Sequence, residues 1–202
     1  MQLKLIIEFQ TAVHHGSGYG LSGVVDRGAL RDDEGMPYLA GSAIKGKFRH
    51  TATRVVRADG DRVCGTPEYP ALCRGGNACA VCVVFGSSRL PGAAIFGDAY
   101  PCEPERSILK LQIASSRSAV MSGGSDVRGS TAIDRRSGTV LPEHLFSTET
   151  LPSLVRFESE IEWPESSVKL FRECLKLIGT FGGDAARGLG WCTLQLDGGE
   201  RT

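Results

Sequence analysis

The stretch Pro37–Arg49, PYLAGSAIKGKFR, decides the fold of the chain around it. Tyr38 and Leu39 are typical of the end of an extended segment, and Gly41 permits a tight turn. Ser42 follows where its hydroxyl can cap the start of a helix. Apolar residues then recur at helical spacing, which predicts a helix with one face on a core; they are Ile44, Phe48, Ala52 and Val55.

The predicted helix is strongly basic. Between Ser42 and Arg57 there is no acidic residue, and the basic ones are Lys45, Lys47, Arg49, Arg54 and Arg57. Unpaired amides and the helix dipole favour negative charge at a helix start, so this stretch predicts an anion site. The alternative is an ordinary amphipathic helix whose basic face is solvated.

The composition is that of an ordinary globular protein. The chain has 202 residues, of which 41% are hydrophobic and 23% charged, enough for one substantial core with an inserted lobe. Twenty-three basic residues balance 23 acidic ones, so net charge does not indicate a nucleic-acid partner. The charged residues are nevertheless segregated along the chain. Acidic residues outnumber basic ones over 143–173, and basic residues outnumber acidic ones over 106–136. This pattern predicts a basic side and an acidic side.

The sequence contains no segment that predicts a membrane partner. No apolar run approaches the roughly 18–20 residues that a membrane helix needs. Met1–Phe9 is short and alternates in polarity, which is typical of a strand and not of a signal peptide. We therefore expect a cytoplasmic protein.

Four of the seven cysteines fall in a segment that is rich in Gly and Pro and shows no apolar periodicity, residues 59–85. They are Cys64, Cys73, Cys79 and Cys82. The C-x2-C pair suits two corners of a zinc tetrahedron, so the segment predicts a structural zinc site. The alternatives are reduced structural cysteines, or a histidine (His14, His15 or His50) in place of one thiolate. The other cysteines are expected in the core.

The order of elements predicts an α+β fold. Strands are expected at Gln2–Thr11, Val83–Phe85, Ala93–Asp98, Leu109–Ser116, Leu151–Trp163 and Trp191–Leu196, with a second helix after Pro164 that Ser166 or Ser167 caps. A basic excursion over 115–145 contains a hairpin-like turn at Ser137-Gly138. This order is compatible with a βαββαβ ferredoxin-like core that carries two insertions.

Two glycine-rich loops complete the chain, His14–Ser22 and Phe181–Gly190. Glycine allows backbone to approach a ligand closely, so both loops are candidate binding segments. An acidic cluster follows the first loop, with Asp26, Asp32 and Asp33. Most such aspartates are turn residues or caps.

Taken together, these segments resemble the RAMP superfamily of CRISPR systems, and most closely the backbone subunit repeated along type III effector complexes. The resemblance rests on the order of several motifs over most of the chain. They are His15-Gly16, the Asp26 loop, PYLAGSAIKGKFRH, a cysteine-rich segment that ends in Phe85-Gly86, RLPGAAIFGDA, TAIDRRSGTV and GGDAARGLGW.

The resemblance implies a single domain over residues 1–202 with an RRM-like core that binds CRISPR guide RNA. Copies of the chain would stack with one another and with other subunits, and a thumb-like hairpin would kink the duplex of guide and target RNA. The residues it places near RNA are His15, Gly16, Ser42, Lys45, Lys47, Arg49, Arg135, Gly182, Gly183, Arg187 and Gly188. A cradle for the guide requires Lys45, Lys47 and the turn over 182–190 to lie on one side of the molecule.

The resemblance also implies that Asp26 supports cleavage of target RNA. The carboxylate would assist attack by a 2′-hydroxyl as general base, or hold a divalent cation such as Mg or Mn. The alternatives are a catalytically inactive guide-binding subunit and a guide-processing endonuclease that uses His14 or His15. A zinc-stabilised adaptor with no RNA role is the reading from outside the family.

Overall fold

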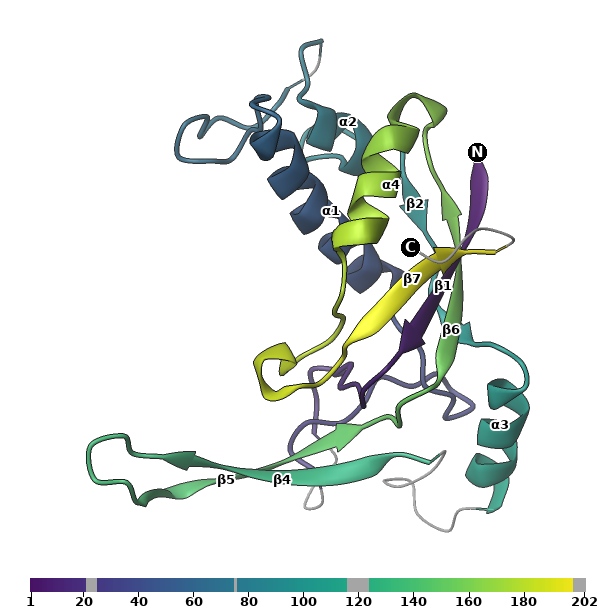
Figure 1. Ribbon diagram of the computed structural model, residues 1–202, viewed down its shortest axis with the longest axis vertical. Coiled ribbons are helices and arrows are strands. Elements are labelled where there is room, and N and C mark those ends of the chain that lie inside the picture. The colour runs from purple at the N-terminus through teal and green to yellow at the C-terminus, as the bar shows by residue number, and fades with distance from the viewer. Residues whose placement is uncertain (21–24, 75, 116–123, 198–202) are drawn as a thin grey trace.

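The computed structural model of the chain describes residues 1–20, 25–74, 76–115 and 124–197 (Figure 1). It is a mixed α/β structure with antiparallel sheets, as the sequence predicts. The elements are β1 (Gln2–Phe9), α1 (Gly41–Ala58), α2 (Ala80–Phe85), β2 (Ile95–Phe96), β3 (Tyr100–Pro101), α3 (Glu105–Ser115), β4 (Asp126–Ile133), β5 (Val140–Thr150), β6 (Arg156–Glu162), η1 (Glu165–Ser167), α4 (Val168–Leu177), η2 (Ala185–Arg187) and β7 (Cys192–Leu196).

The main sheet has the strand order β2-β6-β1-β7, with β3 also paired to β6, and all its pairs are antiparallel. The alternation read from the sequence gives β1 one buried face, formed by Leu5, Ile7 and Phe9. In β6, Phe157 and Ile161 are buried in the same way. The strands predicted at both ends of the chain and before Pro164 are therefore confirmed.

Helices α1 and α4 cover one face of this sheet and leave the other open (Figure 1). Aromatic rings fill the space between the helices and the sheet: Phe48 of α1 stacks on Phe171 of α4 with ring centroids 5.4 Å apart. On the open face Glu8 lies opposite Arg156 and Lys4 opposite Glu160 in the register of β1 and β6, while the Lys4 ammonium forms its ion pair with Glu158 at 3.4 Å. Glu158 and Glu162 add to that face, so its outward residues are mainly acidic.

Helix α1 buries the stripe predicted for it, with Val56 in place of Val55. It begins at Gly41, and Ser42 is an exposed residue of the first turn and not the cap. The Gly41 amide donates instead to Asp98 Oδ1 at 2.7 Å. Helix α1 starts against the backbone of β2, where a Cβ on Gly41 would collide with the Phe96 carbonyl. Glycine is therefore required at this position.

Two predicted strands are wrong, because both segments are helical. Leu109–Ser116 was expected to extend a sheet, but its described residues, 109–115, belong to α3, which buries Leu109 and whose Glu105 carboxylate accepts a hydrogen bond from Arg156 Nε at 2.8 Å. Val83–Phe85 ends helix α2. One helical turn there brings the sulfurs of the C-x2-C pair to the same side, which an extended chain would not do.

Strands β4 and β5 form a separate two-stranded sheet that extends to one side of the body (Figure 1). The turn predicted at Ser137-Gly138 is confirmed: Gly138 N–H donates to the Asp134 carbonyl at 2.8 Å, and Ser137 Oγ donates to Asp134 Oδ2 at 2.7 Å. The hairpin continues to Thr150. Residues 116–123 of the predicted excursion lie outside the described residues.

Candidate functional site

A cleft of about 530 Å³ lies between the first turns of α1 and the two glycine-rich loops. We call it the glycine cleft. Lys47 reaches it from α1 and donates to Thr180 Oγ1 at 3.0 Å, just before the closing loop. Its lining residues are His14, His15, Gly16, Ala43, Gly46, Lys47, His50, Phe181, Gly182 and Gly183.

The two glycine-rich loops meet because both pack around His14. The Gly183 amide donates to the His14 carbonyl at 2.9 Å, and Gly182, at φ +82°, leaves no room for a Cβ beside that carbonyl. On the other side, a Cβ on Gly16 would lie 2.8 Å from His14 Nε2. The His14 ring is buried and its Nδ1 donates to the Glu149 carbonyl at 2.8 Å. Glycine is therefore needed on both sides of this imidazole.

The basic residues predicted to flank the guide do not all face the glycine cleft. Lys47 lines it, whereas Lys45 Nζ donates to the Ala94 carbonyl at 3.1 Å, on the side of α1 that faces β2. Side chains two positions apart on a helix do not share a face, which accounts for the difference. Lys47 and the turn at Gly182-Gly183 thus lie together, but Lys45 lies elsewhere, so the predicted cradle with both lysines beside the closing loop does not form.

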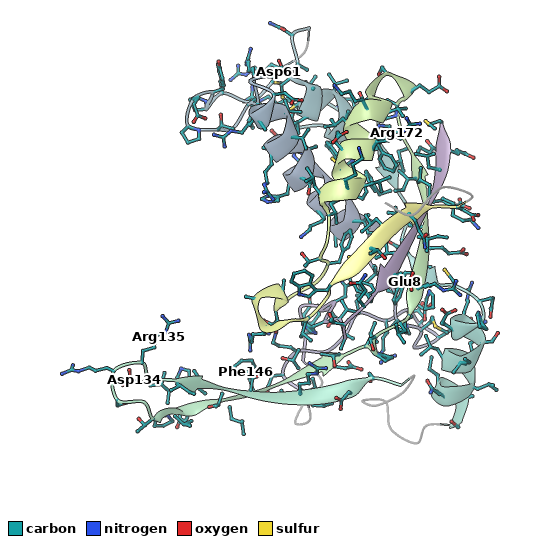
Figure 2. All side chains as sticks on the ribbon, in the orientation of Figure 1. Glu8, Asp61, Asp134, Arg135, Phe146 and Arg172 are labelled. Atoms are coloured by element: carbon teal, nitrogen blue, oxygen red, sulfur yellow. The ribbon has the colours of Figure 1, made fainter. Side chains whose placement is uncertain are left out.

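Arg187 ties the closing loop to the hairpin. Its Nη2 donates to Asp184 Oδ1 at 2.7 Å, and its guanidinium lies 5.5 Å from the centroid of the Phe146 ring on β5. Asp184 also accepts from Arg27 Nη1 at 2.9 Å. Arg135, by contrast, lies at the tip of the hairpin (Figure 2). Of these two predicted RNA-contact residues, Arg135 therefore lies at the tip of the hairpin, and Arg187 contacts the hairpin at Phe146.

A second cleft of about 360 Å³ adjoins the first, and we call it the aspartate cleft. The two clefts adjoin, because they share three lining residues of the glycine loops; the shared residues are His14, Gly16 and Gly183. The remaining lining residues of the aspartate cleft are Gly18, Tyr19, Asp26, Arg27 and Gly28.

Hydrogen bonds from Ser147 to one oxygen of the Asp26 carboxylate hold the side chain in this cleft. Oδ2 accepts from the Ser147 amide at 2.7 Å and from Ser147 Oγ at 2.9 Å. The amide first, and then the hydroxyl, hold the pKa of Asp26 below its usual value, so the group is an exposed carboxylate. Within the described part of the chain Oδ1 accepts no hydrogen bond. Asp32, in contrast, accepts from the amides of Glu34 and Met36, as predicted for a turn residue.

Glu149 and Ser147 were not predicted as site residues. Glu149 is fully buried; its Oε1 pairs with Arg31 Nη2 at 2.7 Å and its Oε2 accepts from the Ala29 amide at 2.8 Å. These bonds fix the segment that follows Asp26. The partners are more than a hundred residues apart in sequence, and the only sequence signal is a carboxylate in a run of hydroxyl residues.

The four predicted zinc cysteines converge, with all four sulfurs buried and within 4.8 Å of one another. The Sγ atoms of Cys64 and Cys82 are 3.2 Å apart and those of Cys64 and Cys79 are 3.9 Å apart. A zinc tetrahedron with bonds near 2.3 Å separates its sulfurs by about 3.8 Å. The donor set therefore fits a closed structural zinc site.

The surroundings of the sulfurs favour a thiolate at Cys79 and oppose one at Cys82, whose pKa is raised by burial and then by the Cys64 and Cys79 thiols. Burial opposes ionisation of Cys79, but backbone amides of Cys64 and Cys82 outweigh it and lower its pKa to about 7. Burial raises the pKa of Cys174 and of Cys192 to about 12, as expected for inert core cysteines. His14, His15 and His50 line the glycine cleft, so none of them replaces a thiolate.

The sequence profile of the RAMP superfamily matches residues 6–193. The chain belongs to the RAMP superfamily. Its fold is similar to a chain of a type III-B Cmr-beta complex in the apo state, with a TM-score of 0.65 and 14% identity over 97% of both chains. It is also similar to a chain of a type IV-B CRISPR complex, with a TM-score of 0.62 and 17% identity over 97% of this chain and 90% of that one. Curated protein sequences gave no match.

The residues around Asp26 of this RAMP chain do not form a cation site of their own. Among the described residues, the only group of three or more His, Cys, Asp or Glu that could hold a metal ion is the cysteine cluster. Asp26 supplies one carboxylate, and Mg²⁺ held by so few protein ligands takes the rest of its octahedron from water and substrate phosphates. The residues of the described chain alone therefore do not support the expectation of Mg or Mn at this site.

His15 accepts a bond inside the RAMP fold. Its Nε2 accepts from the Ala40 amide at 3.1 Å, at the start of α1. Burial first, and then the neighbouring His14, lower the pKa of His15 from 6.5. The neutral ring is therefore the form that holds the helix start.

We expect acid to destabilise the RAMP fold through His15. The unfolded chain binds a proton near pH 6.5 while the folded ring resists it. The stability contributed is full above that pH and is lost as the pH falls through the folded pKa. The midpoint of thermal unfolding, recorded from about pH 7.5 to about pH 5.5, measures this loss of stability across the range in which histidine titrates. His15→Gln keeps an acceptor for the Ala40 amide and should flatten the dependence of stability on pH. An unchanged slope in this variant would contradict the assignment of the pH dependence to His15, because His14 and His50 are still present in it.

Proposed function

We propose that the chain is a guide-RNA-binding subunit of a CRISPR effector complex in which Asp26 supports cleavage of target RNA. Membership of the RAMP superfamily and the fold shared with chains of type III-B and type IV-B complexes support the first part. One of those relatives is a Cmr-beta complex bound to cognate target RNA, with 15% identity to this chain. Other copies and other subunits of the complex would be its partners.

The core is, in this proposal, a ferredoxin-like βαββαβ domain spanning residues 1–202. The strand order supports it, because β6 separates the two strands of the unit β1-α1-β2, and β1 separates those of β6-α4-β7. This is the arrangement of a split β-α-β pair. The zinc segment (59–85) and the hairpin segment (115–145) would be insertions into that core.

The observation that carries the proposal is that the glycine and aspartate clefts lie side by side and share three lining residues. Protein backbone amides that glycine leaves exposed, together with the Lys47 ammonium, can contact RNA phosphates whatever the base sequence. The open sheet face suits it less, because Glu8, Glu158, Glu160 and Glu162 repel phosphates there. RNA would therefore follow the loops at the end of the sheet and not cross the sheet as in an RRM.

Asp26 would act on RNA that continues into the aspartate cleft. A kinked nucleotide can align its own 2′-hydroxyl with the adjacent phosphate, and the attack then expels the 5′-oxygen and leaves a cyclic phosphate. Ser147 holds Oδ2, and among the described residues no other residue binds Oδ1, so Oδ1 would accept the hydrogen bond from that hydroxyl. Because a carboxylate of lowered pKa is a weak base, Asp26 is better suited to orient the 2′-hydroxyl than to take its proton; that proton would leave to solvent, and solvent would protonate the departing 5′-oxygen.

Lys47→Ala in the full-length chain should weaken binding of short single-stranded RNA about 3–10-fold and reduce the slope of log affinity against log salt by about one. Lys45→Ala is the matched control, since it removes the same charge from the other side of α1. Fluorescence anisotropy over a salt series measures both. Equal losses in the two variants would contradict the glycine cleft as the binding site, and binding without a salt slope would indicate an adaptor with no RNA role.

A further inference from the structure

The Asp26 loop is paired to the base of hairpin strand β5. Arg27 forms a parallel bridge with Thr148, its amide donates to the Ser147 carbonyl at 3.1 Å, and its carbonyl accepts from the Glu149 amide at 2.9 Å. The loop is thus paired with β5 through this isolated bridge. Because backbone hydrogen bonds fix register as well as distance, a displacement of this part of the hairpin would carry Asp26 with it.

The side chains of Ser147 and Asp26 add a reciprocal bond to that pairing. Ser147 Oγ donates to Asp26 Oδ2 at 2.9 Å and accepts from the Asp26 amide at 3.0 Å. The Ser147 amide donates to the same Oδ2 at 2.7 Å. Since Asp26 is exposed, packing does not fix its rotamer, and these bonds are what orient the carboxylate toward the cleft.

We propose that Ser147 is a positioning residue for Asp26 and that the β4–β5 hairpin, through Ser147, sets the placement of the carboxylate when RNA is bound. This inference rests on the proposed function, because it presumes that Asp26 supports cleavage. The hairpin has a second connection to the same site, from Phe146 through Arg187 and Asp184 to Arg27. Two separate sets of contacts therefore connect the hairpin to the Asp26 loop.

Single-turnover cleavage by the assembled complex tests the proposal. Ser147→Ala should lower the cleavage rate about 10–100-fold with target affinity within about twofold, since misplacement of a reacting group costs rate and not binding. Ser147→Thr, which keeps the hydroxyl, should restore most of the rate. Ser130→Ala is the control, because it makes the same chemical change on the same hairpin. Ser130 lies on β4, opposite Phe146.

A double-mutant cycle separates positioning from a general structural role. If Ser147 acts through Asp26, Ser147→Ala should have no further effect on the residual rate of an Asp26→Asn complex. Additive losses would overturn the proposal, as would a parental rate in Ser147→Ala while Asp26→Asn is inactive. Parental cleavage by Asp26→Asn would instead overturn the proposed function itself. Should Ser147→Ala not assemble, Ser147→Cys, similar in shape but a weak donor, replaces it in every arm.

Discussion

Asp26→Asn in the assembled complex is expected to lower target-RNA cleavage by about 100-fold, because the amide nitrogen that replaces Oδ1 cannot accept a hydrogen bond from the 2′-hydroxyl and so cannot orient it. Guide and target binding should remain within about twofold, because asparagine keeps the size of the side chain and one oxygen for the Ser147 donors. Cleavage of end-labelled target under single-turnover conditions, with target affinity measured in parallel, gives both quantities.

Asp32→Asn is the matched control for this experiment. It makes the same chemical change in the segment after Asp26, but the Asp32 carboxylate accepts from the amides of Glu34 and Met36. We expect near-parental cleavage from it. Parental cleavage by the Asp26 variant would leave the chain as a guide-binding subunit without a catalytic role, which is the inactive alternative considered from the sequence.

The second large effect concerns the cysteine cluster. Replacing Cys79 and Cys82 together by serine should abolish zinc binding and lower the free energy of unfolding by about 5 kcal/mol or more, since structural zinc sites contribute folding energy directly. For a chain of this size such a loss corresponds to a fall in Tm of about 10–20 °C. Elemental analysis should find about one zinc per parent chain, as four thiolates make one tetrahedral site.

Cys102→Ser is the control for the zinc prediction. Cys102 is half-buried and belongs to no metal-ligand cluster of the described chain. This variant should keep both the metal and most of the parental Tm. A parent protein that is well folded and free of metal would contradict the zinc assignment, and the four sulfurs would then be reduced core cysteines.

Regular local patterns allowed much of the fold to be predicted. Alternation placed the strands around Ile7 and Phe157, and a period near 3.6 placed the buried stripe of α1. The C-x2-C pair marked the metal cluster. Each of these signals depends on residues within one element, because burial of one face imposes a period on the sequence whatever the element packs against.

Other features depended on packing that no local pattern records. Helix α3 was predicted as a strand, since its segment has few buried residues to show a helical period. The cap of α1 was assigned to Ser42, whereas the Gly41 amide bonds to Asp98. The predicted set of basic residues did not distinguish Lys47 from Lys45, because only the position of the closing loop gives one side of α1 a cleft.

The sequence by itself determined the superfamily, the α+β class, the cysteine cluster and Asp26 as the candidate carboxylate, because each depends on residue types at short or ordered spacing. Only the tertiary structure decided how that carboxylate is held. Ser147 and Glu149 reach the Asp26 loop across about 120 residues of intervening chain. Hydrogen bonds between side chain and backbone at such separation need only a donor and an acceptor in place, and therefore impose no period or motif on the sequence.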